Sequence, residues 1–145
     1  TIKSMNPNIM AGLTVPGRAI YHGDLIWTGK DGKIQFSFAD ESILVSLEPE
    51  AELQIYSKYN NCYIHLNHGN IHTKNSRLVG KVNIQTENSM ITQEGGEMWI
   101  HRDYLGNDEI YVIRGKVLIK HVNGSEKSIR MGEMLISVND GILPP

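Results

Sequence analysis

The sequence has 145 residues, the usual size of one domain, with 40% hydrophobic and 21% charged residues and a formal net charge of -2 at pH 7. This composition excludes a disordered chain. The Lys and Arg residues are spread without a cluster, which excludes a groove for nucleic acid or a polybasic membrane patch. No run of 18 apolar residues is present, so the sequence predicts no membrane span.

The first 16 residues differ from the rest of the chain. Pro7 and Pro16 break any helix there, and the apolar residues follow no period of two. We predict an extended N-terminal arm over 1–16, which either folds back on its own domain or docks on a neighbouring molecule. Its apolar contacts would come from Ile2, Met5, Ile9, Met10, Leu13 and Val15.

From residue 17 onward, short strand-like runs follow one another, separated by Gly-rich turns. The alternation of Ile34, Phe36 and Phe38 with polar residues is typical of a half-buried strand, and Asn123-Gly124 indicates a hairpin. A polar stretch over 67–76 is expected to interrupt the series. The predicted strands are 24–28, 33–38, 42–47, 51–56, 61–66, 81–86, 89–93, 97–101, 109–113, 116–121, 127–130 and 134–138.

These runs predict an all-β protein without a substantial helix. About a dozen short strands would form either a two-sheet sandwich or a twisted, solenoid-like β roll, because strand pairing cannot be read from alternation alone. We expect one β domain over 17–139, followed by a short tail over 140–145. Ile142 and Leu143 in that tail are apolar residues with no evident partner in the sequence.

The single cysteine, Cys62, excludes an internal disulfide. It alternates with Ile64 and Leu66, so it should share their inward face. We predict a buried structural thiol, with a reactive or intermolecular thiol as the alternative.

The order of several short motifs resembles the FecR domain. The opening phrase is Gly23-Asp24 to Ala39-Asp40, which includes Thr28 and Asp31-Gly32. Later steps are Ile64 to Gly69, Val82 to Thr86, Val112 to Val117 and Met131 to Glu133. Gly95 to Ile100 stands where the family usually reads Gly-Thr-x-Phe-x-Val, and Gly96 and Trp99 depart from that pattern. The resemblance covers 17–138.

The resemblance implies a β-rich, extracytoplasmic domain. The best-known members of the family pass signals from outer-membrane receptors to sigma factors, and others are modules of surface or secreted proteins. Those signalling members also carry an anti-sigma segment, a membrane helix and a receptor-facing part.

Three histidines, His65, His68 and His72, are weak candidates for a metal site. Imidazoles are good zinc or copper ligands, and three ligands would leave one coordination position open. Their segment contains no cysteine or carboxylate, however. We therefore predict solvated surface histidines and no bound metal or other cofactor.

A degenerate cupin-like metal enzyme is a further alternative. His101, Asp103 and Glu109, together with Gly95 and Gly115, fall near the spacing of the first cupin motif. In the second motif Leu135 replaces the metal-binding histidine and Arg130 replaces the usual proline. No nucleophile elbow or phosphate-binding loop is present either. We therefore predict that the protein is not an enzyme and has no catalytic residues.

The favoured hypothesis is a non-catalytic, extracytoplasmic protein–protein interaction module. It would be a surface or secreted structural subunit that self-associates through its arm or its open sheet edges into an oligomer or polymer. The alternative is the receptor-facing part of a FecR-type signalling regulator of a sigma factor. In both cases the partner is protein, either copies of the chain or a membrane receptor, and not nucleic acid.

Overall fold

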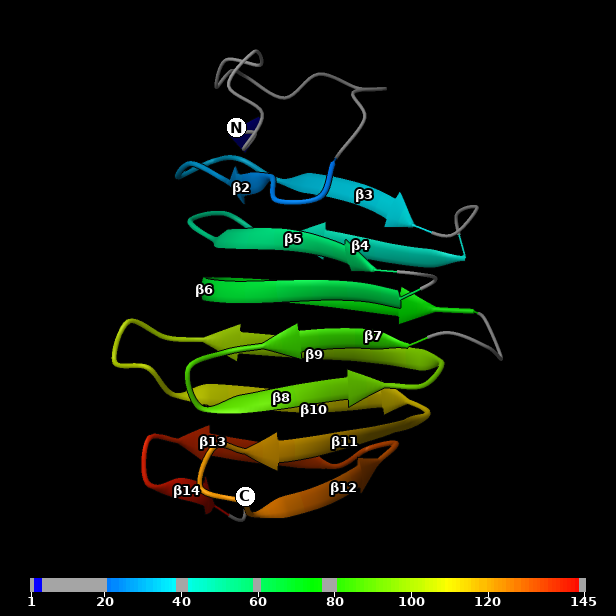
Figure 1. Cartoon of the computed structure of the whole chain (residues 1–145), viewed down its shortest axis with the longest axis vertical. Helices are drawn as coiled ribbons and strands as arrows, with labels where there is room; N and C mark the ends of the chain where they lie inside the picture. The colour runs from blue at the N-terminus through cyan, green and yellow to red at the C-terminus, as the bar shows by residue number, and fades with distance from the viewer. Residues whose placement is uncertain (1, 4–20, 39–41, 59–60, 77–80, 144–145) are drawn as a thin grey trace.

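The computed structural model describes residues 2–3, 21–38, 42–58, 61–76 and 81–143. Within these ranges the chain is all β, which confirms the predicted fold class. Strands are stacked like rungs in two layers, with the N-terminal strands at one end of the stack and the C-terminal strands at the other (Figure 1). No helix long and apolar enough to cross a membrane is found in the described part of the chain.

One layer, called sheet A here, begins at the N-terminal end of the stack. Neighbouring strands are antiparallel except for β6 and β7, which are parallel. In spatial order its strands are β1 (Ile2–Lys3), β2 (Leu25–Trp27), β5 (Glu52–Lys58), the first part of β6 (Asn61–Asn75), β7 (Val82–Gln85), β8 (Ser89–Gln93), β11 (Lys116–His121) and β12 (Glu126–Arg130).

The second layer, sheet B, is antiparallel throughout the described residues. Its strands in spatial order are β3 (Ile34–Phe38), β4 (Ile43–Leu47), the second part of β6, β9 (Gly96–Arg102), β10 (Asp108–Arg114), β13 (Met134–Val138) and β14 (Gly141–Leu143). Strand β6 therefore belongs to both layers and passes from one to the other.

The chain alternates between the layers. Hairpins β7–β8 and β11–β12 lie in sheet A, and hairpins β9–β10 and β13–β14 lie in sheet B. The parallel pairing of β6 with β7 is a single solenoid-like step within this antiparallel arrangement. The fold thus combines features of the sandwich and of the roll that the sequence left open.

The core lies between the two layers and follows from period-two alternation. In β4, for example, Ile43, Val45 and Leu47 are buried while the residues between them are half-buried. Each such aliphatic side chain contributes roughly 1.5–3 kcal/mol when fully buried. The large side chains that are fully buried include Ile26, Ile43, Leu47, Leu53, Ile55, Ile64, Leu66, Ile71, Ile84, Ile91, Met98, Ile100, Ile110 and Ile119.

The polar stretch 67–76 does not interrupt the strands as predicted, because β6 continues to Asn75. Its inward-facing polar side chains find partners within the core. Thr73 is fully buried, and its hydroxyl donates to Oε1 of Gln93 over 2.7 Å. Because a hydrogen-bonded polar group can be buried at little cost, low hydrophobicity did not exclude a strand here.

Two glycines allow close contacts where the chain changes layers. Gly69, within β6, has a φ of 102°, and a Cβ at this position would lie 2.3 Å from the Cβ of Ala51. Gly96 begins β9 with a φ of 85°, and its Cβ would lie 2.1 Å from the carbonyl oxygen of Arg114. Both positions therefore require glycine for its conformation and for its size.

The two predicted terminal segments are only partly described. Ile2 pairs with Ile26 across β1 and β2, whereas Met5, Ile9, Met10, Leu13 and Val15 lie outside the described residues. The predicted tail contains β14, in which Ile142 packs against the core and Leu143 is 47% exposed. The side chain of Cys62 lies outside the described residues, so its burial stays a prediction. The division into arm, domain and tail also stays a prediction.

Candidate interaction surface

The outer face of sheet B carries a row of aromatic and apolar side chains. The strand register places His72, Trp99, Tyr111 and Met134 side by side on four adjacent strands. The rings of His72 and Trp99 are tilted against each other, with centroids 4.6 Å apart. Because these residues alternate with buried ones, they face away from the core. We call His72, Trp99, Tyr111 and Met134 the aromatic row.

A groove of about 470 Å³ runs beside this row and is lined mainly by apolar groups. A β-bulge in β10 shapes one of its sides, since the pairing with β9 skips Ile113, which is 42% exposed. Bulges commonly redirect a side chain in this way. The groove is lined by Asn70, Trp99, Ile100, His101, Tyr111 and Ile113.

Polar contacts hold the aromatic row in place. Nε2 of His72 lies 3.0 Å from a carboxylate oxygen of Glu97. The hydroxyl of Tyr111 donates to Glu109 over 3.2 Å. Partial burial, together with this carboxylate, raises the pKa of Tyr111 above its ordinary value of 10.0. The tyrosine is therefore neutral at physiological pH and offers an uncharged aromatic surface to a partner.

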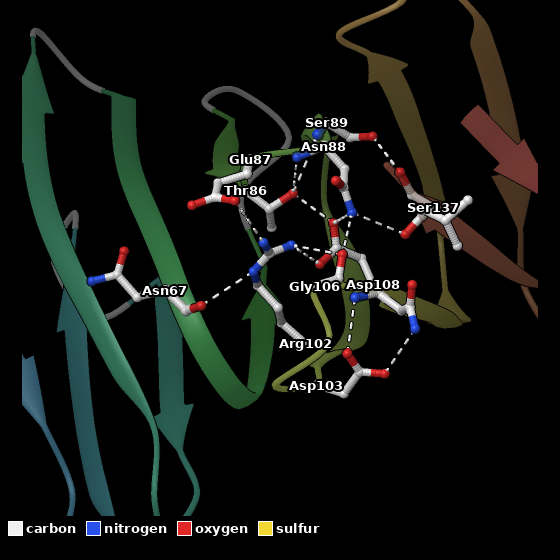
Figure 2. A network of polar contacts seen from close by, with 12 residues as sticks. Asn67, Thr86, Glu87, Asn88, Ser89, Arg102, Asp103, Gly106, Asp108 and Ser137 are labelled. Carbon is white, nitrogen blue, oxygen red and sulfur yellow. Dashed lines mark hydrogen bonds and ion pairs between the residues drawn. The ribbon is translucent and has the colours of Figure 1, made fainter. Parts of the chain in front are cut away.

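A second cluster, which is polar and buried, lies at the edge of the stack near the β9–β10 turn (Figure 2). Nη1 of Arg102 lies 2.7 Å from Oδ1 of Asp108, and the two side chains are only 5% and 0% exposed. Oδ2 of Asp108 accepts hydrogen bonds from Thr86 over 2.5 Å and from Asn88 over 3.3 Å. Burial raises the pKa of the Asp108 carboxyl, while these hydrogen bonds and Arg102 act in the opposite direction.

The buried network connects two turns, β7–β8 and β9–β10, with strands β6, β9 and β13. The side-chain amide of Asn88 donates to the carbonyl of Ser137 in β13 and to the carbonyl of Gly106 in the β9–β10 turn. Nε of Arg102 donates to the carbonyl of Asn67 in β6. The network therefore fixes the relative positions of elements at this edge, and the side chains of Arg102 and Asp108 are closed to solvent.

The three candidate metal-binding histidines have different partners. His65 bonds to Asn67, and Nδ1 of His68 lies 3.0 Å from the carbonyl of Glu50. His72 belongs to the aromatic row. Among the described residues, no group of three or more His, Cys, Asp or Glu side chains could hold a metal ion. The structure therefore does not bring the histidines together.

The residues of the cupin-like pattern are also engaged in separate contacts. His101 is hydrogen-bonded to Asn70, Asp103 closes the β9–β10 turn, and Glu109 accepts from Tyr111. His101 and Glu109 are direct neighbours across β9 and β10. Leu135, in place of the usual histidine, is buried in the core.

The sequence predictions did not single out Trp99 and Tyr111 as binding residues. A signal was nevertheless present, because in 97–101 the alternation that buries Met98 and Ile100 requires Trp99 to face outward. An aromatic residue facing outward on a predicted strand merits separate consideration, because large exposed apolar side chains often mark binding surfaces.

The profile of the family described as FecR protein matches residues 24–118, which include most of both sheets and the aromatic row as far as Tyr111. The chain belongs to the FecR family. This confirms the resemblance found in the sequence motifs. No curated protein sequence matches this FecR chain.

Two crystal structures of a candidate anti-sigma factor from Parabacteroides distasonis ATCC 8503, at 1.65 and 2.50 Å resolution, are similar to this FecR chain. Both give a TM-score of 0.70, with sequence identities of 15% and 16%. Each match covers 82% of this chain and 57% of the other, so the chain spans little more than half the length of these neighbours. At this identity the likeness concerns the fold.

Proposed function

We propose that this FecR domain is the partner-facing part of a cell-surface signalling regulator. It acts outside the cytoplasm by binding another protein and not by catalysis. The observation that carries the proposal is the aromatic row with its adjoining groove on the outer face of sheet B. The family match supports a signalling role, as does the likeness in fold to a candidate anti-sigma factor.

The physical basis is the composition of that face. Trp and Tyr dominate the binding energy of many protein interfaces because they bury large areas with few rotatable bonds. Here each aromatic side chain extends from a central strand of a hydrogen-bonded sheet, so little conformational freedom is lost on binding. The bulge at Ile113 adds a further apolar contact beside the groove.

This function would require the partner to cover the aromatic row in one signalling state and leave it in the other. A receptor at the cell surface and a downstream sigma factor are the partners expected of such a regulator. The rest of the regulator would then respond to whether the aromatic row is bound by the receptor or free.

The test is a Trp99→Ala substitution in the full-length protein in the organism that encodes it. A buried interface tryptophan contributes about 2 kcal/mol or more, which corresponds to a loss of affinity of more than tenfold. The transcripts that depend on the cognate sigma factor should therefore change, as measured by RNA sequencing. Tyr63→Ala is the matched control, because Tyr63 is a half-buried aromatic residue in the sheet A part of β6.

Unchanged transcripts in the Trp99 variant, at a normal level of folded protein, would contradict the proposed function. The folded level is checked by thermal unfolding of the purified chain. A change of equal size in the Tyr63 variant would also contradict it, since the effect would then not belong to the sheet B face.

A second candidate function is the self-associating structural subunit, which a feature at the C-terminal end of the stack favours. There the last described strands, β12 and β14, flank a hollow of about 530 Å³ lined by Lys127, Ile129, Gly132, Glu133, Met134, Leu135, Ile142 and Leu143. A sheet edge beside an apolar hollow can accept a strand from another copy. Light scattering at rising concentration would test it: a wild-type chain that grows in size and a Leu143→Glu variant that does not would support self-association, and a strictly monomeric wild type would exclude it.

A further inference from the structure

The β9–β10 turn, residues 103–107, carries the two most exposed large apolar side chains of the described residues. Tyr104 is 79% exposed and Leu105 is 88% exposed. We call residues 103–107 the tip loop. Exposed apolar side chains on a mobile loop bind weakly, because ordering the loop on binding costs conformational entropy. On a rigid loop that cost is small, so the same side chains offer a binding surface.

The tip loop is held in one conformation by Asp103. One oxygen of its carboxylate accepts hydrogen bonds from the backbone N–H groups of Leu105 and Asn107, each over 2.9 Å. The other oxygen accepts from the side-chain amide of Asn107 over 3.1 Å. The ring of Tyr104 stacks on His68 of β6, with centroids 5.4 Å apart.

The buried polar network supports the same loop from beneath (Figure 2). The carbonyl of Gly106 accepts a hydrogen bond of 2.6 Å from Asn88 and a longer one, of 3.4 Å, from Arg102. A buried ion pair is a poor source of stability compared with apolar packing, so its value here is in fixing one arrangement. That arrangement holds the base of the tip loop to the β7–β8 turn.

The charged side chains around the loop are predominantly acidic. Glu87, 83% exposed, approaches Arg102 at 3.5 Å, but Arg102 itself is buried against Asp108. Asp103 lies within the loop, and Glu52 accepts a hydrogen bond from Asn67, the residue before His68. A partner surface with Lys or Arg around an apolar pocket would complement this charge.

We propose that the tip loop is a second docking element, which inserts Leu105, flanked by Tyr104, into an apolar pocket rimmed by Lys and Arg on a protein partner. This inference rests on the proposed protein-binding function and adds a contact at a different edge of the molecule. The rigid backbone and the small number of ordered side chains make such a loop suited to an interface hot spot.

The experiment uses the full-length protein in the organism that encodes it, with the photo-crosslinking amino acid p-benzoylphenylalanine placed in turn at positions 99, 105 and 122. Val122, 70% exposed in the β11–β12 turn, is the control position. We expect positions 99 and 105 to crosslink to the same protein and position 122 to give no adduct. Mass spectrometry should map the adduct from position 105 to apolar residues with Lys or Arg beside them.

Binding of that protein to the purified full-length chain then measures the contribution of the loop. We expect L105S to weaken the affinity at least tenfold and V122S to leave it unchanged. We also expect the wild-type affinity to fall as salt rises, because the rim is acidic. D103A, which keeps Leu105 but frees the loop, should weaken binding by less than L105S.

The outcomes separate this inference from the proposed function. If position 99 gives the adduct and position 105 does not, or if L105S binds normally, the inference about the tip loop is wrong and the proposed function stands. If neither position gives an adduct, both are wrong. An adduct from position 105 to another copy of the chain or to lipid would also overturn the inference.

Discussion

The two outer faces of the stack are built from similar strands but differ in what they expose. Every large apolar side chain that is exposed within a described strand lies on sheet B: Tyr111, Ile113 and Leu143. On sheet A, no large apolar side chain of a described strand is exposed, and several polar side chains bond to one another. Tyr56 donates to Gln54, Thr92 to Asn83, and Lys120 pairs with Glu126.

This difference follows from the alternation of side chains along each strand, in which inward residues build the core and outward residues are available to contact other molecules. Inward positions of both sheets contribute to the shared core, so they are similar in the two layers. Outward positions contribute little to the core, so a group of large apolar residues gathered there indicates a contact with another molecule. The following predictions test whether the two faces are as independent as this comparison implies.

The largest effect on stability is expected from breaking the buried ion pair of Arg102 and Asp108, which supports both sheets. Asp108→Ala leaves Arg102 buried without its counter-charge, which should lower the free energy of unfolding by about 3–5 kcal/mol. Urea denaturation measures this change, and both faces should lose binding and order together. The double variant R102M/D108L, with no buried charge, should recover most of the loss. A loss below about 1 kcal/mol in the single variant would mean that Arg102 reaches water.

The next largest effect is expected at the end of β10, where the chain leaves sheet B. Gly96→Ala introduces a Cβ 2.1 Å from the carbonyl oxygen of Arg114 at a positive φ, so the backbone beside the Ile113 bulge must move. We expect a loss of about 2–4 kcal/mol in stability, from strain plus displacement.

The matched control is Gly124→Ala, because Gly124 has a φ of 95° but a Cβ added there would meet no atom within 4 Å. It should lose only about 1–2 kcal/mol, the cost of the left-handed conformation. Equal losses in the two variants would show that the close contact at Gly96 relaxes freely. NMR shifts of Trp99 should change only in the Gly96 variant.

A smaller effect is expected at the tip loop, and it depends on pH. Hydrogen bonds, chiefly from the backbone of Asn107, lower the pKa of Asp103 below its ordinary value of 3.8. The ionised carboxylate therefore stabilises the fold above the unfolded pKa, and this contribution is lost as the pH falls through the folded pKa. Asp103→Ala should cost about 1 kcal/mol at pH 7.

Measured against the wild type, the effect of Asp103→Ala should shrink below pH 3.8. The pH dependence due to Asp108 has the opposite sign. Burial raises the pKa of its carboxyl, so the folded chain holds this proton more tightly than the unfolded chain, and that contribution to stability is lost as the pH rises through the folded pKa. Denaturation curves of D103A and of the wild type from about pH 2 to pH 7 separate the contributions of the two carboxyls to stability, because Asp108 is present in both chains. A difference between D103A and the wild type that does not vary with pH would contradict the role given to the carboxylate.

The smallest effect is expected on sheet A. Lys120→Ala removes an ion pair of 3.3 Å with Glu126, whose side chains are 62% and 53% exposed. Water screens the attraction between such exposed charges, so the pair contributes little to stability. The change in unfolding free energy should be about 0–1 kcal/mol, with binding of any sheet B partner unchanged. A weaker affinity in this variant would show that the partner also covers sheet A.

Much of the fold could be predicted from alternation. The strands around Ile34, Val82 and Ile110 follow period two, and the family motifs place the turns between them. Strand pairing could not be predicted, because β6 joins both sheets and carries buried polar residues such as Thr73 in place of an apolar pattern.

The candidate surface was predictable only in part. The outward position of Trp99 follows from its buried neighbours, but its place beside His72 depends on the pairing of β9 with β6, which is separated from it in the sequence by β7 and β8, and its place beside Tyr111 depends on the register of the β9–β10 hairpin. The partnership of Arg102, Asp108 and Asn88 depends in the same way on turns that meet in space. The order of charged and apolar residues along the chain does not show which strands and turns will lie next to one another.

The sharing of β6 between the two layers has a consequence for how the molecule opens. In the described residues, every strand ladder between the N-terminal strands β2–β5 and the C-terminal strands β7–β14 passes through β6. Each end of the stack can therefore fray while the other stays folded, but neither half can leave without exposing one side of β6. Its central amide protons should be among the last to exchange with deuterated water, whereas those of β14 should be among the first.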